Sequence, residues 1–455
     1  MKGISKREIA SMKKSVTTLL VLSLAGNIFP AFNVAAISGL FPIYLLSRDS
    51  VEPRRHGYDP SVARKYLLAG YVYWIASYIC TGAPISNLFS FDFLRFDGAL
   101  LIAYLPLLLV ADMRLDALFI RRMLGLFLNM MSIVALLGVA EFIDSTVAPI
   151  GLSQLPEPLQ LIHNASLSAG IFHGFFRAHN AAGAIYSIAA LISFALLARA
   201  KSPSLLSWPA FWFATNVTGI VLTQSRTAYV AFIATLVIMF FRQKEFLKRS
   251  IKYAGPILLP LAYLLLVQPT VTHRAQEVSD LEDPNIVTRF VYYQRAIDDF
   301  TLSPVVGTGF GRFNDQLKIY SGVPHLLYFA TGGSSVDDDS HAHNSYLHFL
   351  AEGGIVGLTL MLGVWIATFR WVGRQRHIFE EGSFGHCFAL GIQACIVLEF
   401  FMSFTEHMMG TAVSALTIFT FAGLFLNLVG WKYRVAAVID SNVIRAGQLA
   451  LGSAT

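Results

Sequence analysis

Residues 208–242 read WPAFWFATNVTGIVLTQSRTAYVAFIATLVIMFFR, and this stretch decides how the chain is arranged across a membrane. It is apolar except for the group TQSR at 223–226. One helix of about 34 residues would be about 50 Å long, which is too long for a single membrane span. Basic residues flank both ends, at Lys201 and Arg242, so the number of crossings between them must be even. The stretch therefore predicts two short membrane helices with Arg226 at their outer apex.

Apolar stretches of this kind recur along the whole chain. Of the 455 residues, 55% are hydrophobic and only 14% are charged. In a soluble domain, roughly a quarter of the residues are charged. The stretches that approach membrane length are 15–29, 31–47, 66–83, 97–111, 123–143, 180–198, 208–223, 225–241, 254–268, 346–369, 384–403 and 410–430. This pattern predicts an all-α, polytopic integral membrane protein of about twelve transmembrane helices.

The basic residues predict the orientation of these helices. Most of the 34 lysine and arginine residues lie in every second gap between the apolar stretches, and cytoplasmic loops have the excess of basic residues. Both termini are then cytoplasmic. The net charge of +6 reflects this asymmetry, and we expect no nucleic-acid partner. A signal peptide at 13–30 is the alternative for the first stretch, but another apolar run follows it at once, which favours a retained helix.

The predicted organisation has four parts. Residues 1–268 form nine transmembrane helices, and 269–345 form one large outer loop with short helices of its own. Residues 346–430 form three more transmembrane helices, and 431–455 form a cytoplasmic tail.

Within the large loop, residues 286–300 read IVTRFVYYQRAIDDF and have the apolar spacing of a helix. The apolar face comprises Val291, Ala296 and Phe300. Arg289 and Arg295 are expected to point elsewhere. Arginine favours an anionic ligand, because its planar fork grips phosphate oxygens in pairs. The alternative is pairing with lipid headgroups or with acids of the same loop. No acidic residue lies near Arg226 in sequence, which favours an anionic ligand over an ion pair at this arginine.

Residues 337–357 read DDDSHAHNSYLHFLAEGGIVG and start the tenth predicted span. Asn344 is a plausible helix cap, which places His343 at the outer membrane–water boundary, where a neutral imidazole can accept a proton from a hydroxyl. His348 lies one turn deeper, as a partner of this site. A metal site formed by Asp337 to Asp339 with His341 and His343 is an alternative, and so is a merely hydrated loop.

Two glycine patterns accompany the histidines. Gly353, Gly354 and Gly357 allow a neighbouring helix to approach closely. The Gly-x-Gly-x-Gly run at 307–311 does not open a βαβ unit, so we interpret it as a turn and not as a phosphate cradle.

Taken together, these motifs resemble those of the O-antigen ligase and O-antigen polymerase superfamily. The resemblance covers roughly residues 170–360. It rests on four segments: Thr223-Gln-Ser-Arg226-Thr-Ala, Arg289 with Tyr293 and the 307–313 loop, His343-Asn344-Ser345 with the following glycines, and Phe176-Arg-Ala-His179-Asn180. The family often has Trp at the place of Tyr293.

The resemblance implies a reaction at the periplasmic face of a bacterial inner membrane, with 269–345 as the periplasmic catalytic loop. The donor would be a glycan on undecaprenyl diphosphate, and the enzyme would be an inverting glycosyltransferase without a metal or another cofactor. His343 would be the general base, and Arg226 and Arg289 would stabilise the diphosphate. The remaining substrate-binding candidates are Arg177, His179, Asn180, Arg295, Asn344 and His341.

The sequence leaves the acceptor open. A ligase would use lipid A–core, a polymerase of O-antigen or exopolysaccharide repeats would use another lipid-linked glycan, and protein glycosylation is a third option. A flippase or transporter is the alternative of a different class, since twelve spans suit it. Transporters, however, usually have polar groups at mid-membrane and repeat symmetry, whereas the polar chemistry here concentrates in one outer loop.

Overall fold

The computed structural model describes residues 61–82, 99–110, 115–146, 176, 179–197, 207–242, 248, 251–252, 255, 284–313, 341–409 and 414–433. The regular structure in these ranges is helical throughout. The predicted spans 15–29 and 31–47 lie outside the described residues, as does 254–268 apart from residue 255, and every other predicted span falls largely on described helices. Of the predicted outer loop 269–345, residues 284–313 and 341–345 are described, and of the predicted tail 431–455 only residues 431–433.

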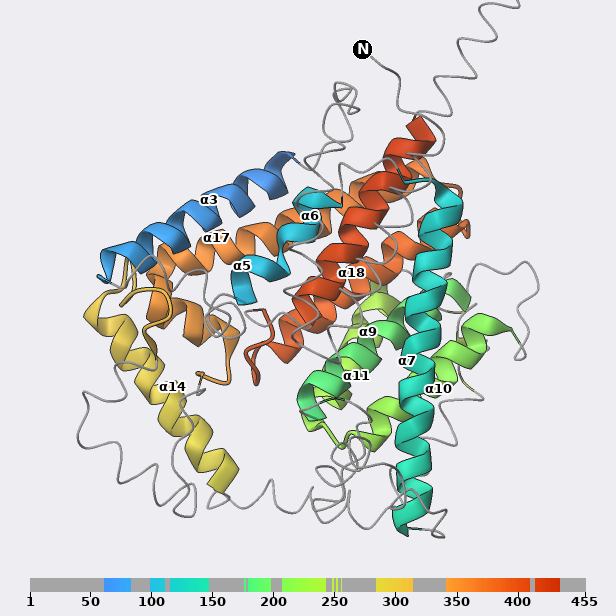
Figure 1. Cartoon of the computed structure of the whole chain (residues 1–455), viewed down its shortest axis with the longest axis horizontal. Helices are drawn as coiled ribbons and strands as arrows, with labels where there is room; N and C mark the ends of the chain where they lie inside the picture. Colours follow the sequence, from blue (N-terminus) through green and yellow to red (C-terminus); the bar gives the residue numbers. More distant parts are fainter. Residues whose placement is uncertain are drawn as a thin grey trace, which may run out of the picture.

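The helices follow one another along the chain as parts of one bundle (Figure 1). They are α3 (Ser61–Cys80), α5 (Ala99–Ala103), α6 (Leu105–Leu109), α7 (Ala117–Thr146), α9 (His179–Leu197), α10 (Trp208–Leu222), α11 (Arg226–Arg242), α14 (Pro284–Leu302), α17 (Ser345–Gln375), the short 3-10 helix η4 (Arg376–Ile378), α18 (Phe384–Met402) and a last helix, Ser414–Tyr433. Among the described helices, α7, α9, α17 with η4, α18 and the last helix are long and apolar enough to cross a membrane. The chain is therefore a multi-pass membrane protein.

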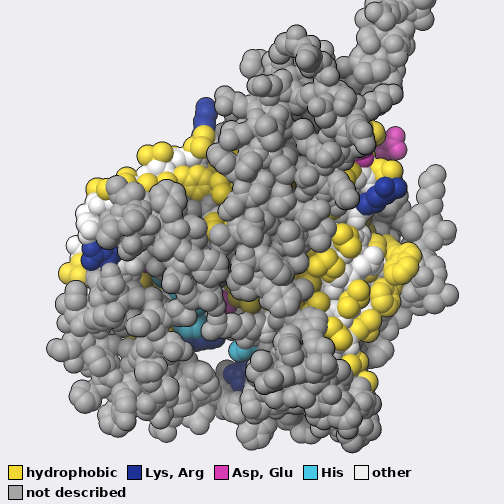
Figure 2. Space-filling model, in the orientation of Figure 1, with side chains coloured by type: hydrophobic (Ala, Val, Ile, Leu, Met, Phe, Trp, Pro, Cys, Tyr) yellow, Lys and Arg dark blue, Asp and Glu magenta, His cyan; other side chains and the backbone are white. Residues whose placement is uncertain are grey.

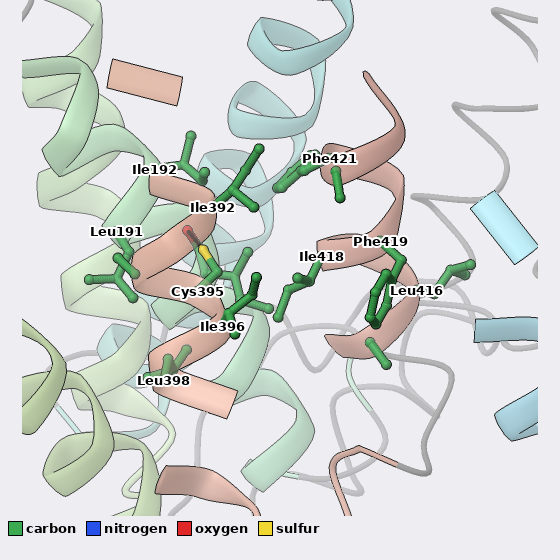
Figure 3. Packing of buried hydrophobic residues seen from close by; sticks show 14 of the residues in the cluster. Leu191, Ile192, Ile392, Cys395, Ile396, Leu398, Leu416, Ile418, Phe419 and Phe421 are labelled. Atoms are coloured by element: carbon green, nitrogen blue, oxygen red, sulfur yellow. Dashed lines mark hydrogen bonds between the residues drawn. The ribbon is translucent and has the colours of Figure 1, made fainter. Parts of the chain in front are cut away.

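The core of the bundle lies where α9, α18 and the last helix meet. Figure 3 shows Leu191 and Ile192 of α9 near Ile392 and Cys395 of α18, with Phe419 of the last helix across from them. These side chains are almost completely buried. A helix that is apolar on all sides belongs in the interior of a bundle. By contrast, α7 and α17 are buried along only half of their apolar length, which leaves one side of each for lipid.

Residues 208–242 fold as two short helices. α10 ends at Leu222, Gln224 has a left-handed backbone with φ 51°, and α11 begins at Arg226. The hydroxyl of Tyr229 donates to the carbonyl of Val221 at 2.5 Å, which ties the first turn of α11 to the last turn of α10. The predicted helix pair with Arg226 at its apex is confirmed.

The predicted span 97–111 is not one continuous helix. α5 ends at Ala103, and α6 begins at Leu105. Pro106 lies in the first turn of α6 and has no backbone N–H to continue the hydrogen bonds of α5. The apolar pattern could not show this break, because the residues on both sides of it are apolar.

α17 is interrupted near its start, and the loop after α14 fills the interruption. Gly354 has φ 59° and breaks the helix. The amides of Thr308 and Gly309 donate to the carbonyls of Ala351 and Glu352 at 2.9 and 3.0 Å. The Gly-x-Gly-x-Gly run thus forms turns that donate to backbone groups of α17, which agrees with its interpretation as a turn.

The other glycines of this segment let α3 pack closely on α17. An added Cβ at Gly353 would lie 2.4 Å from the Trp74 ring of α3, and one at Gly357 would lie 2.9 Å from it. Both distances are shorter than real contacts allow, so only glycine fits. The expected close approach of a neighbouring helix is confirmed, with α3 as the neighbour.

Candidate functional site

Glu406 is the centre of a polar site formed by four separate parts of the chain. It lies in the turn after α18 and is only 5% exposed. Arg289 of α14 places Nη2 at 2.7 Å from its Oε1, and Asn180 of α9 donates its side-chain amide to the same oxygen. His343, just before α17, places Nδ1 at 3.4 Å from Oε2. We call the end of the bundle that contains Glu406 and His343 the site end.

Side chains of the expected types gather at this end. Figure 2 shows histidine side chains next to lysine or arginine side chains in its lower part. Arg289 and His343 are each about one third exposed, at 33% and 31% of the side chain, whereas Glu406 beneath them is buried. A ligand can therefore reach the cation and the imidazole but meets the carboxylate only through them.

The backbone around His343 orients its ring. His343 has φ 48°, a conformation that is uncommon for a residue with a side chain. Asn344 caps α17 by accepting from the Leu347 amide at 3.0 Å, and its own amide donates to the Phe404 carbonyl at 2.9 Å. The Ser345 amide donates to the Ser403 carbonyl. The start of α17 is thus fastened to the turn that contains Glu406, and the predicted Asn344 cap is confirmed.

Asn180 connects the site to the α10–α11 turn. Its side-chain oxygen accepts from the Ser225 hydroxyl at 2.7 Å, while its nitrogen donates to Glu406. Thr227 contacts Thr405 through their hydroxyls at 2.8 Å. Arg226 lies between Ser225 and Thr227 and is half-buried, so the fold brings it to the site end together with Arg289 and His343.

Three further histidines lie behind His343. The ring of His341 lies 4.3 Å from that of His343, and the ring of His407 lies 5.5 Å from His341 and 4.0 Å from His348. Burial, and then the neighbouring histidines, lower the pKa of His407 well below its usual value. Burial first, and then His343, His348 and Arg289, lower the pKa of His341 as well. Both rings are therefore neutral at neutral pH.

The remaining expected site residues are His179, Arg177 and Arg295. His179 is the first residue of α9, next to Asn180, and Arg177 lies outside the described residues. Arg295 was expected to point away from the apolar face, but it is 2% exposed and contacts the fully buried Asp299 at 3.0 Å. Burial raises the pKa of Asp299, although Arg295 opposes this shift. Arg295 thus lies inside the protein, where its pairing with Asp299 offsets the cost of burying both groups.

Glu406 and His407 were missed by the sequence analysis. A signal for them exists, because the short gap between 384–403 and 410–430 falls on the outer side by the same alternation of basic gaps. Two titratable residues in so short a gap on the predicted outer side would have been candidate site residues. Among the described residues, no group of three His, Cys, Asp or Glu side chains is arranged to bind a metal ion, and Asp337 to Asp339 lie outside that part of the chain.

These features define a class of protein: a helical, multi-pass membrane protein with an arginine–histidine–glutamate site at one end of its bundle. Residues 209–362 match the family described as O-antigen ligase. The matched region extends from α10 into α17 and includes Arg226, Arg289 and His343, and the match supports the resemblance to the superfamily of O-antigen ligases and polymerases. No curated protein matches the chain in sequence. The family implies, in general terms, a glycosyltransferase-like enzyme that acts on lipid-linked glycans.

Proposed function

We propose that the protein transfers a glycan from undecaprenyl diphosphate to a sugar hydroxyl at the periplasmic face of a bacterial inner membrane. The observation that carries this proposal is the convergence of Arg289 and His343 on the buried Glu406 at one end of apolar helices. A lipid carrier needs an apolar environment beside a site that handles phosphate and a hydroxyl. The site end offers both.

His343 is the general base of this proposal. Its Nδ1 faces Glu406, so Nδ1 holds the ring proton and Nε2 has the free lone pair for the acceptor hydroxyl. The carboxylate of Glu406 orients the ring and stabilises the imidazolium that forms. General-base catalysis of this kind contributes about 10²–10⁴ in rate.

Arg226 and Arg289 bind the diphosphate. Arg289 uses one nitrogen of its fork for Glu406 and is still one third exposed, so the rest of the guanidinium can face phosphate oxygens. Negative charge on the leaving diphosphate grows in the transition state, and a fixed donor there is commonly worth about 3–4 kcal/mol. The electrostatic role of the arginines is thus strongest where the barrier is highest.

The proposed step balances without a nucleotide or a metal. The acceptor oxygen attacks the anomeric carbon on the face opposite the diphosphate and forms the new glycosidic bond. The bond between the anomeric carbon and the phosphate oxygen breaks, and its electron pair leaves with undecaprenyl diphosphate. The hydroxyl proton moves to Nε2 of His343. Attack from the opposite face inverts the anomeric configuration.

We place ligation onto lipid A–core first and repeat-unit polymerisation second. Transport fits the described residues less well. Glu399, the buried acid of α18, lies in the last turn of that helix near the site end and accepts from the Ser414 hydroxyl at 2.8 Å. It is therefore not an isolated charge at mid-membrane of the kind that transporters use.

The test is complementation of a deletion strain, with lipopolysaccharide and secreted polysaccharide analysed together. Wild type should restore long glycan on lipid A–core, while His343→Ala, Arg226→Ala and Arg289→Ala should not. Glu406→Gln keeps the shape of the side chain but removes the charge beside His343. We therefore expect its transfer activity to fall as well, by about 10²-fold or more.

Arg122→Ala is the matched control, because Arg122 is an exposed arginine of α7 outside the site. Membrane abundance of every variant must equal that of wild type. Restoration of a secreted polymer with unchanged lipopolysaccharide would identify a polymerase and reject lipid A–core as the acceptor. Full activity of His343→Ala would reject the proposed base.

A further inference from the structure

A second hollow lies at the end of the bundle opposite the site end. α17 begins at Ser345 beside Glu406 and ends at Gln375, and α18 returns from Phe384 to Met402. The hollow, of about 540 Å³, lies among the ends of α11 and α17 and the first half of α18. Its volume is in the range of small-molecule sites, about 300–1,000 Å³. We call this end, which contains Arg374 and Arg376, the basic end.

The floor of the hollow is apolar. Met239 of α11, Phe369 of α17 and Leu390 of α18 contribute to its lining. Met239 and Leu390 are 8% and 1% exposed, so they form a packed surface. Such a floor suits the glycerol and the upper acyl chains of a lipid and does not suit a fully hydrated ion.

The rim of the hollow is cationic. Arg370 and Arg374 lie one turn apart on α17, and Arg376 follows at the start of η4. Among the described residues that line the hollow, none is acidic. The acids that follow along the chain, Glu380 and Glu381, are exposed and do not line it.

A buried amide orients part of this rim. Gln393 of α18 accepts from Nη1 of Arg376 at 3.4 Å and donates to the Phe369 carbonyl at 3.3 Å. Gly373 makes room for it, since an added Cβ would lie 2.6 Å from the Gln393 nitrogen. The head of Arg376 is therefore held beside the hollow by a packed polar group, which an arginine that merely extends toward water does not require.

We propose that this hollow binds the phosphate headgroup of an anionic phospholipid from the cytoplasmic leaflet. The three arginines contact the phosphate oxygens, and Met239, Phe369 and Leu390 contact the glycerol and the upper acyl chains. Basic pockets between transmembrane helices on the cytoplasmic side recognise such headgroups. The proposal is independent of the glycosyl-transfer reaction, because no residue of the hollow belongs to the site end.

The test uses the purified full-length protein in a neutral detergent. Phosphatidylglycerol is titrated in, bound lipid is counted by native mass spectrometry, and the thermal unfolding midpoint is recorded. Phosphatidylcholine is the neutral lipid control. Wild type should bind phosphatidylglycerol and unfold at a higher temperature with it, and phosphatidylcholine should do neither.

The variant Arg370→Gln/Arg374→Gln removes two exposed charges of the rim, so the fold should persist. Its apparent Kd for phosphatidylglycerol should rise by at least about tenfold, because one charge-assisted hydrogen bond is worth about 1.5–3 kcal/mol. Lys248→Gln/Lys252→Gln removes two exposed charges that follow α11 and do not line the hollow. This control should bind like wild type.

Equal loss of binding in both double variants would overturn the proposal, since only net charge would then matter. Unchanged binding in the arginine variant would overturn it as well. A parallel titration with inorganic phosphate distinguishes a lipid headgroup from a soluble phosphate as the ligand. Stabilisation by phosphate alone, to the same extent as by phosphatidylglycerol and lost in the arginine variant, would reject the lipid and assign the hollow to a soluble phosphate.

Discussion

At the scale of single residues, Glu406 gives the site its chemical character. One oxygen accepts from Arg289 and Asn180, and the other faces His343. A carboxylate beside both a cation and an imidazole can orient the two at once. These contacts join residues that are far apart in sequence, so the site forms only when α9, α14, α17 and the turn after α18 pack together.

The buried histidines behind His343 predict how stability depends on pH. The pKa values of His341 and His407 are lowered in the folded protein, so below about pH 6.5 the unfolded chain binds more protons than the folded one. The contribution of these two histidines to folding stability is then fully present above about pH 6.5 and is lost as the pH falls. Each histidine can contribute a slope of up to about 1.4 kcal/mol per pH unit.

His407→Phe removes one of these titrating groups and keeps an aromatic ring against His348 and Phe349. Thermal unfolding midpoints of wild type and variant, measured between about pH 5 and pH 8, should therefore diverge. The variant should lose less stability on acidification. Parallel curves would show that His407 binds the same number of protons in both states.

At the scale of elements, the interruption of α17 and the loop that fills it form one unit. The break at Gly354 leaves the Ala351 and Glu352 carbonyls available to the Thr308 and Gly309 amides. Pro304 and Val305 in turn accept from amides of α17 after the break. This exchange holds α14 beside the first turns of α17 and thereby places Arg289 near His343.

Gly307→Ala should be severely destabilising. Gly307 has φ 69°, and an added Cβ would lie 2.2 Å from the backbone carbon of Glu352. Gly82→Ala is the matched control, with φ 78° and nothing within 4 Å. Gly82→Ala should lower the free energy of unfolding by about 1–2 kcal/mol, from the strained backbone alone. Gly307→Ala should lower it by roughly 4 kcal/mol or more. Thermal unfolding and membrane abundance measure the difference, and equal effects would contradict the role of the loop.

At the scale of the whole molecule, the two ends of the bundle differ in chemistry and should lie on opposite sides of the membrane. In a Cys80→Ala background, Thr301→Cys of α14 should react with a membrane-impermeant maleimide added outside. Glu380→Cys, beyond η4, should react only after the inner membrane is permeabilised. The remaining cysteines, Cys387 and Cys395, are buried. Labelling of both positions from outside would contradict the predicted orientation.

The sequence by itself determined the helical membrane architecture, because apolar length and basic gaps are local properties that burial in lipid requires. It also named Arg226, Arg289, His343 and Asn180 as candidate site residues, because they lie in local motifs. Only the tertiary structure decided that Glu406 contacts Asn180, Arg289 and His343, and that Arg295 lies inside with Asp299. It alone placed the glycine loop in the break of α17. These contacts depend on which helices become neighbours, and hydropathy does not encode that choice, since one apolar face packs against many others equally well.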